Sequence, residues 1–362
     1  MDVTVARGDE LTAAQRSQWA ALQAADATLA SPFFHPEFTV AVADVREDVH
    51  VAVIEDGGSL AGFLPFQRGR RPVGAPVGGA RSNYHGVIAA EGAVWDGADL
   101  VRKAGLRIWD FHHLPVSQPG FARFHASTGE SYCVDVSDGF AAYAANRRQG
   151  GSRMVRRVRE KMRRLERDFG PLRLEPHIGD AEILHTVMRW KSDQYRRTGH
   201  VDNFAIEWNV RLLERLLRTD VDGFGGMLVG LYAGDTLAAV DMGLRCHHVF
   251  HSWFPAYNDE LARYSPGLVQ FLLLLEQAES LGLGLIDLGK DHALYKERLA
   301  THLVPLAQGS VLVPSATASA RRARRAAERA VTRTPLVAPA RRAAQELRAF
   351  RARHGILTPH SA

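Results

Sequence analysis

Cysteine is scarce in this chain of 362 residues, which contains two, Cys133 and Cys246. They lie far apart in the sequence and no Cys-x-x-Cys spacing occurs, which excludes a zinc ribbon, a thioredoxin-type motif and a disulfide-stapled miniprotein. Long apolar runs are also absent, because the longest, 268–275, is too short to span a bilayer. The first residues show neither the basic nor the apolar segment of a leader, so we expect a cytoplasmic protein.

Nucleotide and metal motifs are missing as well. The glycine-rich stretch 223–230 has neither Walker A nor Rossmann spacing. Histidines cluster at 112–113 and 247–251, but neighbouring residues on a strand point to opposite faces, so His247 and His251 share one. No third ligand follows at a suitable spacing, and we therefore predict no metal centre.

The composition is that of a folded protein, with 46% hydrophobic and 23% charged residues. The formal charge is +5, yet residues 316–362 hold eleven arginines against Glu328 and Glu346, so the remainder of the chain is net negative. The basic character therefore belongs to a tail of helical composition. We expect this tail to pack on the body, with a partner chain, an anionic membrane surface or RNA as alternatives.

Hydrophobic patterning predicts a mixed α/β fold in two halves that share the order strand, helix, helix, hairpin, further strands. We expect domains at 1–145, 146–315 and a helical tail at 316–362. The predicted strands are 3–6, 49–54, 60–66, 106–111, 131–136, 172–176, 227–232, 237–244, 247–254, 283–288 and 310–313. The predicted helices are 12–25, a second one after Pro36, 147–169, 180–197, 208–217 and 267–281.

The predicted helix at 147–169 is amphipathic and basic. Met154, Val158, Met162, Leu165 and Phe169 form one apolar stripe, arginines occupy the other faces, and Gly170-Pro171 ends the helix. A solvated basic face is the ordinary interpretation, and contact with a nucleotide phosphate or tRNA is the alternative.

The segment 257–296 is the richest in reactive side chains. Ser265-Pro266-Gly267 predicts a helix start, with Ser265 as N-cap, and such a terminus can bind phosphate with help from Arg263. Asp287 ends a buried strand, where ligands gather in open α/β sheets. Further polar residues follow it: Lys290, Asp291, Tyr295 and Lys296.

At this point the sequence resembles a known family. Tyr-Ser-Pro-Gly at 264–267, an apolar helix, and Asp-x-Gly-x-Asp-x-x-x-Tyr-Lys at 287–296 resemble GNAT-type acyltransferases found around bacterial cellulose and exopolysaccharide biosynthesis. Those proteins are similar to the FemAB peptidoglycan aminoacyltransferases, which carry two GNAT folds. Further segments that are similar to the family occur earlier in the chain, in the family's order, at 31–38, 80–86, 153–170 and 190–199.

This resemblance implies a tandem GNAT-like fold whose second half binds the acyl donor. The pantetheine would lie between the strands 247–254 and 283–288, with the pyrophosphate on the helix that starts at Ser265. The implied donor-binding residues are Arg263, Tyr264, Ser265, Gly267, Lys290 and Lys296. The family's Arg-x-x-Gly-x-Gly loop is absent, which leaves acyl-CoA and aminoacyl-tRNA as alternative donors.

Acyl transfer to an amine needs a base, an oxyanion-stabilising donor and an acid. The candidate bases are His251, Asp287 and Asp241. Tyr295 corresponds to the tyrosine that is the general acid in GNAT enzymes, with Tyr264 as alternate. Acceptor contacts are expected from Asn83, Tyr84, His85 and Tyr257, with Asn83 standing where the family more usually has Asp.

We therefore expect an N-acyltransferase that moves an acyl group, acetyl in the simplest case, from acyl-CoA to an amine of a small metabolite or sugar by direct attack. A Fem-like aminoacyltransferase that uses aminoacyl-tRNA is the second hypothesis. A non-catalytic GNAT-like binding module in an envelope-polysaccharide system is the third.

Overall fold

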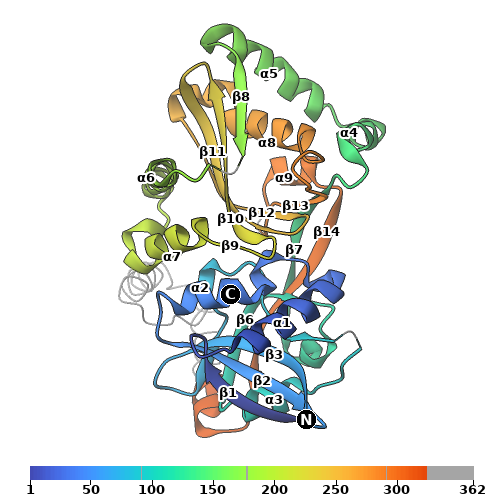
Figure 1. Ribbon diagram of the computed structural model, residues 1–362, viewed down its shortest axis with the longest axis vertical. Helices are drawn as coiled ribbons and strands as arrows, with labels where there is room; N and C mark the ends of the chain where they lie inside the picture. The colour runs from blue at the N-terminus through green and yellow to red at the C-terminus, as the bar shows by residue number, and fades with distance from the viewer. Residues whose placement is uncertain (91, 177, 291, 324–362) are drawn as a thin grey trace, which may run out of the picture. The chain divides into compact units, whose positions relative to one another are not determined.

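The computed structural model describes residues 1–90, 92–176, 178–290 and 292–323. They form two compact units (Figure 1). Unit 1 comprises 1–29, 42–129 and the described residues from Leu306 onward, and unit 2 comprises 30–41 and 130–305. Each unit therefore combines segments from separate parts of the sequence.

Unit 1 is built on a sheet with the strand order β1-β2-β3-β4-β6-β14, in which β4 and β6 are parallel and the other neighbours antiparallel. The short strand β5 pairs with β3. The strands are β1 (Asp2–Arg7), β2 (Val49–Asp56), β3 (Ser59–Arg68), β4 (Val73–Ala75), β5 (Ile88–Ala89), β6 (Ile108–Pro115) and β14 (His302–Leu312). The α-helices are α1 (Ala13–Ala25) and α3 (Gly97–Lys103).

The first helix shows how the sequence of unit 1 dictates local structure. Thr12 and Gln15 form a capping box that satisfies amide groups at the start of α1. Trp19 is fully buried and its ring stacks on Phe63 of β3 at 4.7 Å between centroids. The predicted helix 12–25 and the hairpin β2–β3 are thereby confirmed.

Unit 2 has the strand order β7-β13-β12-β11-β10-β8, with β9 paired to β10. Its strands are β7 (His125–Asp135), β8 (Leu172–Pro176), β9 (Asp220–Val221), β10 (Phe224–Ala233), β11 (Thr236–Cys246), β12 (Val249–Tyr257) and β13 (Leu285–Asp287). Its helices are α4 (Gly139–Gln149), α5 (Met154–Phe169), α6 (Ala181–Thr198), α7 (Glu207–Leu217), α8 (Pro266–Glu276) and α9 (Leu294–Leu299). The helix α2 (Pro36–Ala43) begins in unit 2 and ends in unit 1.

Helices cover both faces of the unit 2 sheet. On one face, Met227, Val229 and Leu231 of β10 share a hydrophobic core with residues of α5 and α8. On the other face, Gly226 lies against the backbone of α7, because a Cβ there would come within 2.8 Å of Leu216. Successive residues of β10 point to opposite faces of the sheet, so one face packs on α5 and α8 and the other on α7.

The parallel pairing between β12 and β13 is short, and it brings polar residues of the two strands together. The paired residues are Val249 with Leu285, Phe250 with Ile286 and His251 with Asp287. Beyond this point β13 ends, while β12 continues to Tyr257. The β11–β12 register shifts next to Gly243, which places a β-bulge at Trp253. The pairing of the two parallel strands therefore ends at His251 and Asp287.

The segment 30–41 belongs to unit 2 although it comes from the first part of the sequence. The ring of Phe33 meets the ring of His251 edge-on at 5.0 Å and that of Trp253 at 5.3 Å. His35 stacks on Phe224 at 4.6 Å, and burial, assisted by the charge of His247, lowers its pKa to about 4.

Three local predictions are corrected. The basic helix 147–169 is two helices, α4 and α5, because Gly150 and Gly151 interrupt it and Gly151 has a φ of 77°. His247 lies in the β11–β12 turn with a φ of 50°, so it does not share a strand face with His251. The strand 283–288 is reduced to β13, residues 285–287.

Two further findings concern the helices of the described residues. None of them is long and apolar enough to cross a membrane. Residues 316–323 of the predicted tail are helical, and the rest of the tail lies outside the described residues.

We predict that Gly243→Ala lowers the free energy of unfolding by about 1–3 kcal/mol, because a Cβ there would lie 2.4 Å from the His251 carbonyl oxygen and the Phe250 ring. Gly179→Ala is the matched control, since no atom lies within 4 Å of its Cβ position. Urea unfolding measures both. Equal stability of the two variants would contradict the close packing at Gly243.

Candidate active site

His251 and Asp287 form a buried pair where β12 and β13 separate. His251 is 0% exposed and Asp287 4%, and the distance from His251 Nδ1 to Asp287 Oδ1 is 3.6 Å. The same Asp287 oxygen accepts a hydrogen bond from the Ser131 hydroxyl at 2.6 Å and from the Gly289 amide at 2.7 Å. Two hydrogen bonds thus fix Asp287 Oδ1, and the His251 ring lies next to it at a distance longer than a hydrogen bond.

Asp241 is a second buried carboxylate, on the neighbouring strand β11. Its Oδ2 accepts a hydrogen bond from the Ser252 hydroxyl at 2.5 Å. Burial raises the pKa of Asp241 to about 6, although Ser252 and the positive charge of Lys191 favour the ionised form. Burial likewise lowers the pKa of Lys191 on α6, against the attraction of Asp241. A carboxylate with a pKa near neutrality is suited to proton transfer.

Tyr295 and Lys296 approach this cluster from α9. Burial and the nearby Asp241 carboxylate raise the pKa of Tyr295 to about 12, while its side chain stays 38% exposed. Lys296 donates hydrogen bonds to the carbonyl oxygens of Lys290 at 2.7 Å and Gly289 at 3.3 Å. Lys296 thus holds the loop after β13, and the structure brings the predicted Asp241, His251, Asp287 and Tyr295 together.

The start of α8 differs from a simple capped terminus. Ser265 occupies the N-cap position with a φ of 51° but its side chain makes no capping hydrogen bond. Its hydroxyl instead accepts a hydrogen bond from Lys161 of α5 at 2.5 Å. Leu268 and Val269 both donate to the Ser265 carbonyl oxygen, and Pro266 has no amide hydrogen. The predicted capping role of Ser265 is therefore wrong.

The remaining features of this terminus can still receive an anion. Apart from its own helix and chain neighbours, no atom lies within 4 Å of the Cβ position of Gly267, so this side of the helix start is open. Tyr264 is buried and its hydroxyl donates to Asp168 at 2.7 Å, while Arg263 donates to the same hydroxyl. Tyr264 is therefore a packing residue, and Arg263 and Lys161 supply the positive charge.

The predicted acceptor residues fall in different places. Tyr257 is the last residue of β12 and is 43% exposed, in unit 2. Asn83, Tyr84 and His85 belong to unit 1, where Tyr84 and His85 are buried. The His85 Nε2 atom accepts hydrogen bonds from the amides of His112 and His113. The rings of Tyr84 and His85 are thus used in packing.

Several site residues escaped the sequence analysis: Phe33, Ser131, Lys161, Lys191 and Ser252. Each comes from an element that is distant in sequence from the segment 257–296 or carries no motif of its own. For Phe33 the signal was the matching segment 31–38, and for Lys191 the matching segment 190–199. Ser131 and Ser252 gave no signal, since a serine on a strand is common.

Comparisons with known proteins concern the fold and the family. Residues 152–297 match the family model of the acetyltransferase (GNAT) domain. This segment of the chain is therefore similar to the GNAT acetyltransferase domain. As predicted, the chain is an acyltransferase, and its fold is mixed α/β with a GNAT-like segment at 152–297. No curated protein matches the sequence.

Three solved structures are similar to this chain, and the two with a TM-score above 0.5 show the likeness of fold. FemX has a TM-score of 0.56 at 8% identity, covering 86% of this chain and 98% of that one. The C-terminal DUF2156 domain of an Agrobacterium fabrum protein has a TM-score of 0.52 at 13% identity, covering 86% and 95%. A tandem GNAT protein from the clavulanic acid biosynthesis pathway has a TM-score of 0.48 at 12% identity, covering 87% and 99%.

We predict a pH-dependent stability difference between Asp241→Asn and the wild type. The pKa of Asp241 is about 6 in the folded chain and 3.8 in the reference state, so its contribution to stability is present below pH 4 and is lost as the pH rises through 6. The variant should therefore gain on the order of 1–3 kcal/mol relative to the wild type between pH 4 and pH 7. Urea unfolding across this range measures the gap, and a constant gap would contradict the raised pKa.

Proposed function

We propose that the chain is an N-acyltransferase that moves an acyl group, acetyl in the simplest case, from acyl-CoA to an amine of a small metabolite or sugar. The observation that carries the proposal is the separation of β12 and β13 beyond His251 and Asp287. A gap between parallel strands leaves backbone groups unpaired, and the pantetheine amides of a donor can pair with them. Asp241 and Tyr295 lie beside this point.

Donor binding draws on residues at both ends of the gap. Arg263, Lys161 and the Gly267 amide at the start of α8 would contact the pyrophosphate of acyl-CoA. Lys296 holds the carbonyl groups of the loop 289–290. The open space at Gly267 supports the close approach of a phosphate.

The reaction is a direct attack. The amine nitrogen of the acceptor bonds to the thioester carbonyl carbon, the tetrahedral intermediate carries an oxyanion, and its collapse breaks the carbon–sulfur bond. Asp241 receives the proton that the nitrogen loses, and Tyr295 gives one to the leaving thiolate. His251, oriented by Asp287, is kept as the alternative base. No covalent enzyme intermediate is required.

Asp241 and Tyr295 influence each other in a direction that favours this sequence. The negative charge of Asp241 contributes to the raised pKa of Tyr295. When Asp241 takes up the amine proton its charge disappears, and the tyrosine becomes a stronger acid. Uptake of one proton therefore promotes release of the other.

We predict that Tyr295→Phe and Asp241→Asn each lower kcat by about a hundredfold or more, because each removes one proton-transfer group. Tyr232→Phe is the matched control, since Tyr232 lies on β10 with its ring against Arg173 at 4.9 Å. Steady-state turnover of acetyl-CoA with a panel of amines measures the effect. Wild-type turnover in both site variants would refute these roles.

The pH dependence gives an independent test. With Asp241 as the base, the wild-type kcat/KM should rise with pH through about 6, the pKa of this carboxyl group. Asp241→Asn should abolish that limb while leaving calorimetric acetyl-CoA binding intact. A limb near pH 6 that persists in Asp241→Asn would transfer the base role to another group.

A Fem-like aminoacyltransferase is the second candidate, supported by the FemX-like fold and by the arginines of α5. The two candidates differ in their donor. Calorimetry with acetyl-CoA and with aminoacyl-tRNA separates them: absence of acetyl-CoA binding at millimolar concentration would refute the first candidate.

A further inference from the structure

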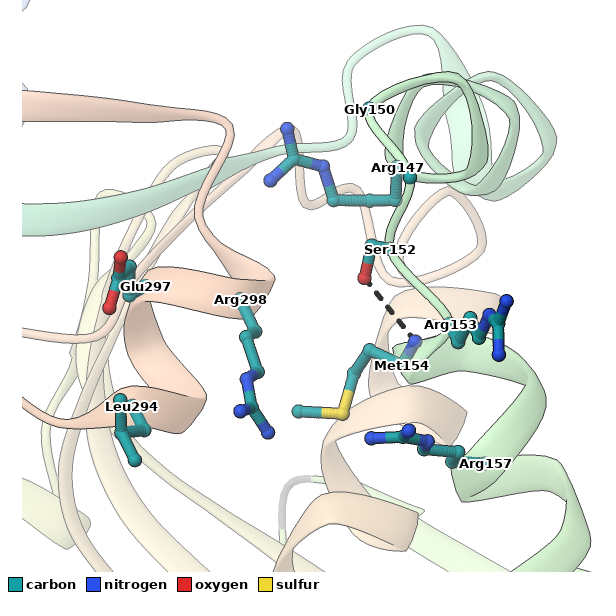
Figure 2. Close-up of a pocket in the computed structure, with 10 residues that line it drawn as sticks. Arg147, Gly150, Ser152, Arg153, Met154, Arg157, Leu294, Glu297 and Arg298 are labelled. Carbon is teal, nitrogen blue, oxygen red and sulfur yellow. Dashed lines mark hydrogen bonds between the residues drawn. The ribbon is translucent and has the colours of Figure 1, made fainter.

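Unit 2 contains a cavity of about 640 Å³ between α9 and the loop that joins α4 to α5. Figure 2 shows it lined by arginines from three elements. Arg147 comes from the end of α4, Arg157 from α5 and Arg298 from α9. Its volume lies within the range of small-molecule sites, about 300–1,000 Å³.

Some arginines of unit 2 have an acidic partner, whereas two that line this cavity have none among the described residues. Arg159, for example, pairs with Glu276 at 2.9 Å and Arg173 with Glu175 at 2.7 Å. Neither Arg157 nor Arg298 forms an ion pair with any residue that the structure describes. The charges at the cavity are therefore not compensated internally.

The acidic residue that lines the cavity does not change this balance. Glu297 pairs with His292 at 3.4 Å, and Figure 2 shows its carboxylate turned away from Arg157. In the same view Arg298 and Arg157 extend toward one another, with Met154 beside them. Two guanidinium groups that face each other repel unless an anion lies between them.

The loop at the base of the cavity is shaped to admit such an anion. Gly150 and Gly151 present no side chains, and Gly151 has a φ of 77° with no atom within 4 Å of its Cβ position. The next residue, Ser152, accepts a hydrogen bond from the Met154 amide at 3.3 Å. Met154 begins α5, so the positive end of this helix dipole adds to the arginine charges.

We propose that this cavity binds a phosphate or diphosphate group. Planar, multidentate guanidinium groups match phosphate oxygens better than lysine ammonium groups do, and the cavity contains arginines without lysine. The phosphate belongs either to the periphery of the acyl donor or to a separate small ligand. The first of these sources rests on the proposed function, and the second does not.

Helix α9 connects this site to the proposed chemistry. Leu294, Glu297 and Arg298, at spacings of three and four residues, line the cavity from one face of the helix. Tyr295, whose pKa responds to Asp241, projects from another part of its circumference. A ligand in the cavity and the proposed acid Tyr295 therefore contact the same short helix.

The test uses the full chain and calorimetry at about 0.15 M salt, where weak surface attraction is screened. The titrants are inorganic pyrophosphate, acetyl-CoA and dephospho-CoA. The double variant Arg157→Ala/Arg298→Ala removes the two guanidinium groups that face each other in the cavity. Its matched control, Arg163→Ala/Arg164→Ala, removes the same charge from α5 outside the cavity. Circular dichroism verifies that both variants fold.

We expect the cavity variant to weaken binding of a phosphate ligand at least about tenfold and the control to stay within about twofold. Loss for acetyl-CoA but not for dephospho-CoA would identify the donor's peripheral phosphate. Loss for pyrophosphate with unchanged binding of both coenzymes would identify a separate ligand. Either result supports the site. Lys161→Ala removes the α5 side chain that contacts Ser265 at the start of α8. This variant distinguishes the two anion sites, because loss of pyrophosphate binding in it alone would overturn the proposal.

Two other results would also overturn it. No pyrophosphate binding at millimolar concentration, together with unchanged coenzyme binding in the cavity variant, would show that the arginines hold no phosphate. Equal losses in the cavity and control variants, with tighter binding of uncharged tRNA than of pyrophosphate, would make α5 a nucleic-acid surface. Failure of acetyl-CoA to bind the wild type would refute the proposed function, and the pyrophosphate titration would still decide this inference.

Discussion

The three-residue parallel pairing of β12 with β13 is the constraint on which the rest of unit 2 depends. Parallel neighbours cannot be joined by a tight turn, so the chain must cross over through α8, whose first residues then follow the end of β12. Because the pairing stops at His251 and Asp287, the buried pair, the helix terminus and the strand gap all belong to one edge.

Desolvation shapes the chemistry at this edge more than any single hydrogen bond does. Burial moves the pKa of Asp241 upward and that of Lys191 downward, so each charge is costly and each partly offsets the other. The arginine cavity on α4, α5 and α9 presents the opposite situation, with charges of one sign that no carboxylate among the described residues neutralises. One unit therefore contains a nearly balanced proton-transfer cluster and an unbalanced anion-binding surface.

The sequence predicted those parts of the site that depend on local patterns. Asp287 could be identified because it ends an apolar strand, and Tyr295 because it completes a spaced motif. The proximity of Tyr295 to Asp241, by contrast, depends on tertiary packing. Ser131 reaches Asp287 across 156 residues of sequence, and no pattern encodes that distance. Alternation also failed at His247, since a turn with positive φ interrupts the period of two. The contiguous halves expected from element order could not anticipate that Phe33 would pack on His251.

The exchange of segments between the units has a consequence for how the chain is made. Residues 30–41 belong to unit 2 and are synthesised early. They cannot pack on β12 until that strand has been synthesised, more than two hundred residues later. The sheet of unit 1 also depends on a strand that is synthesised late. Asp110 of β6 pairs with Ser310 of β14, which lies 200 residues further along the sequence. Neither unit can mature during synthesis as an independent body, so both sheets close late, on contacts of long sequence separation.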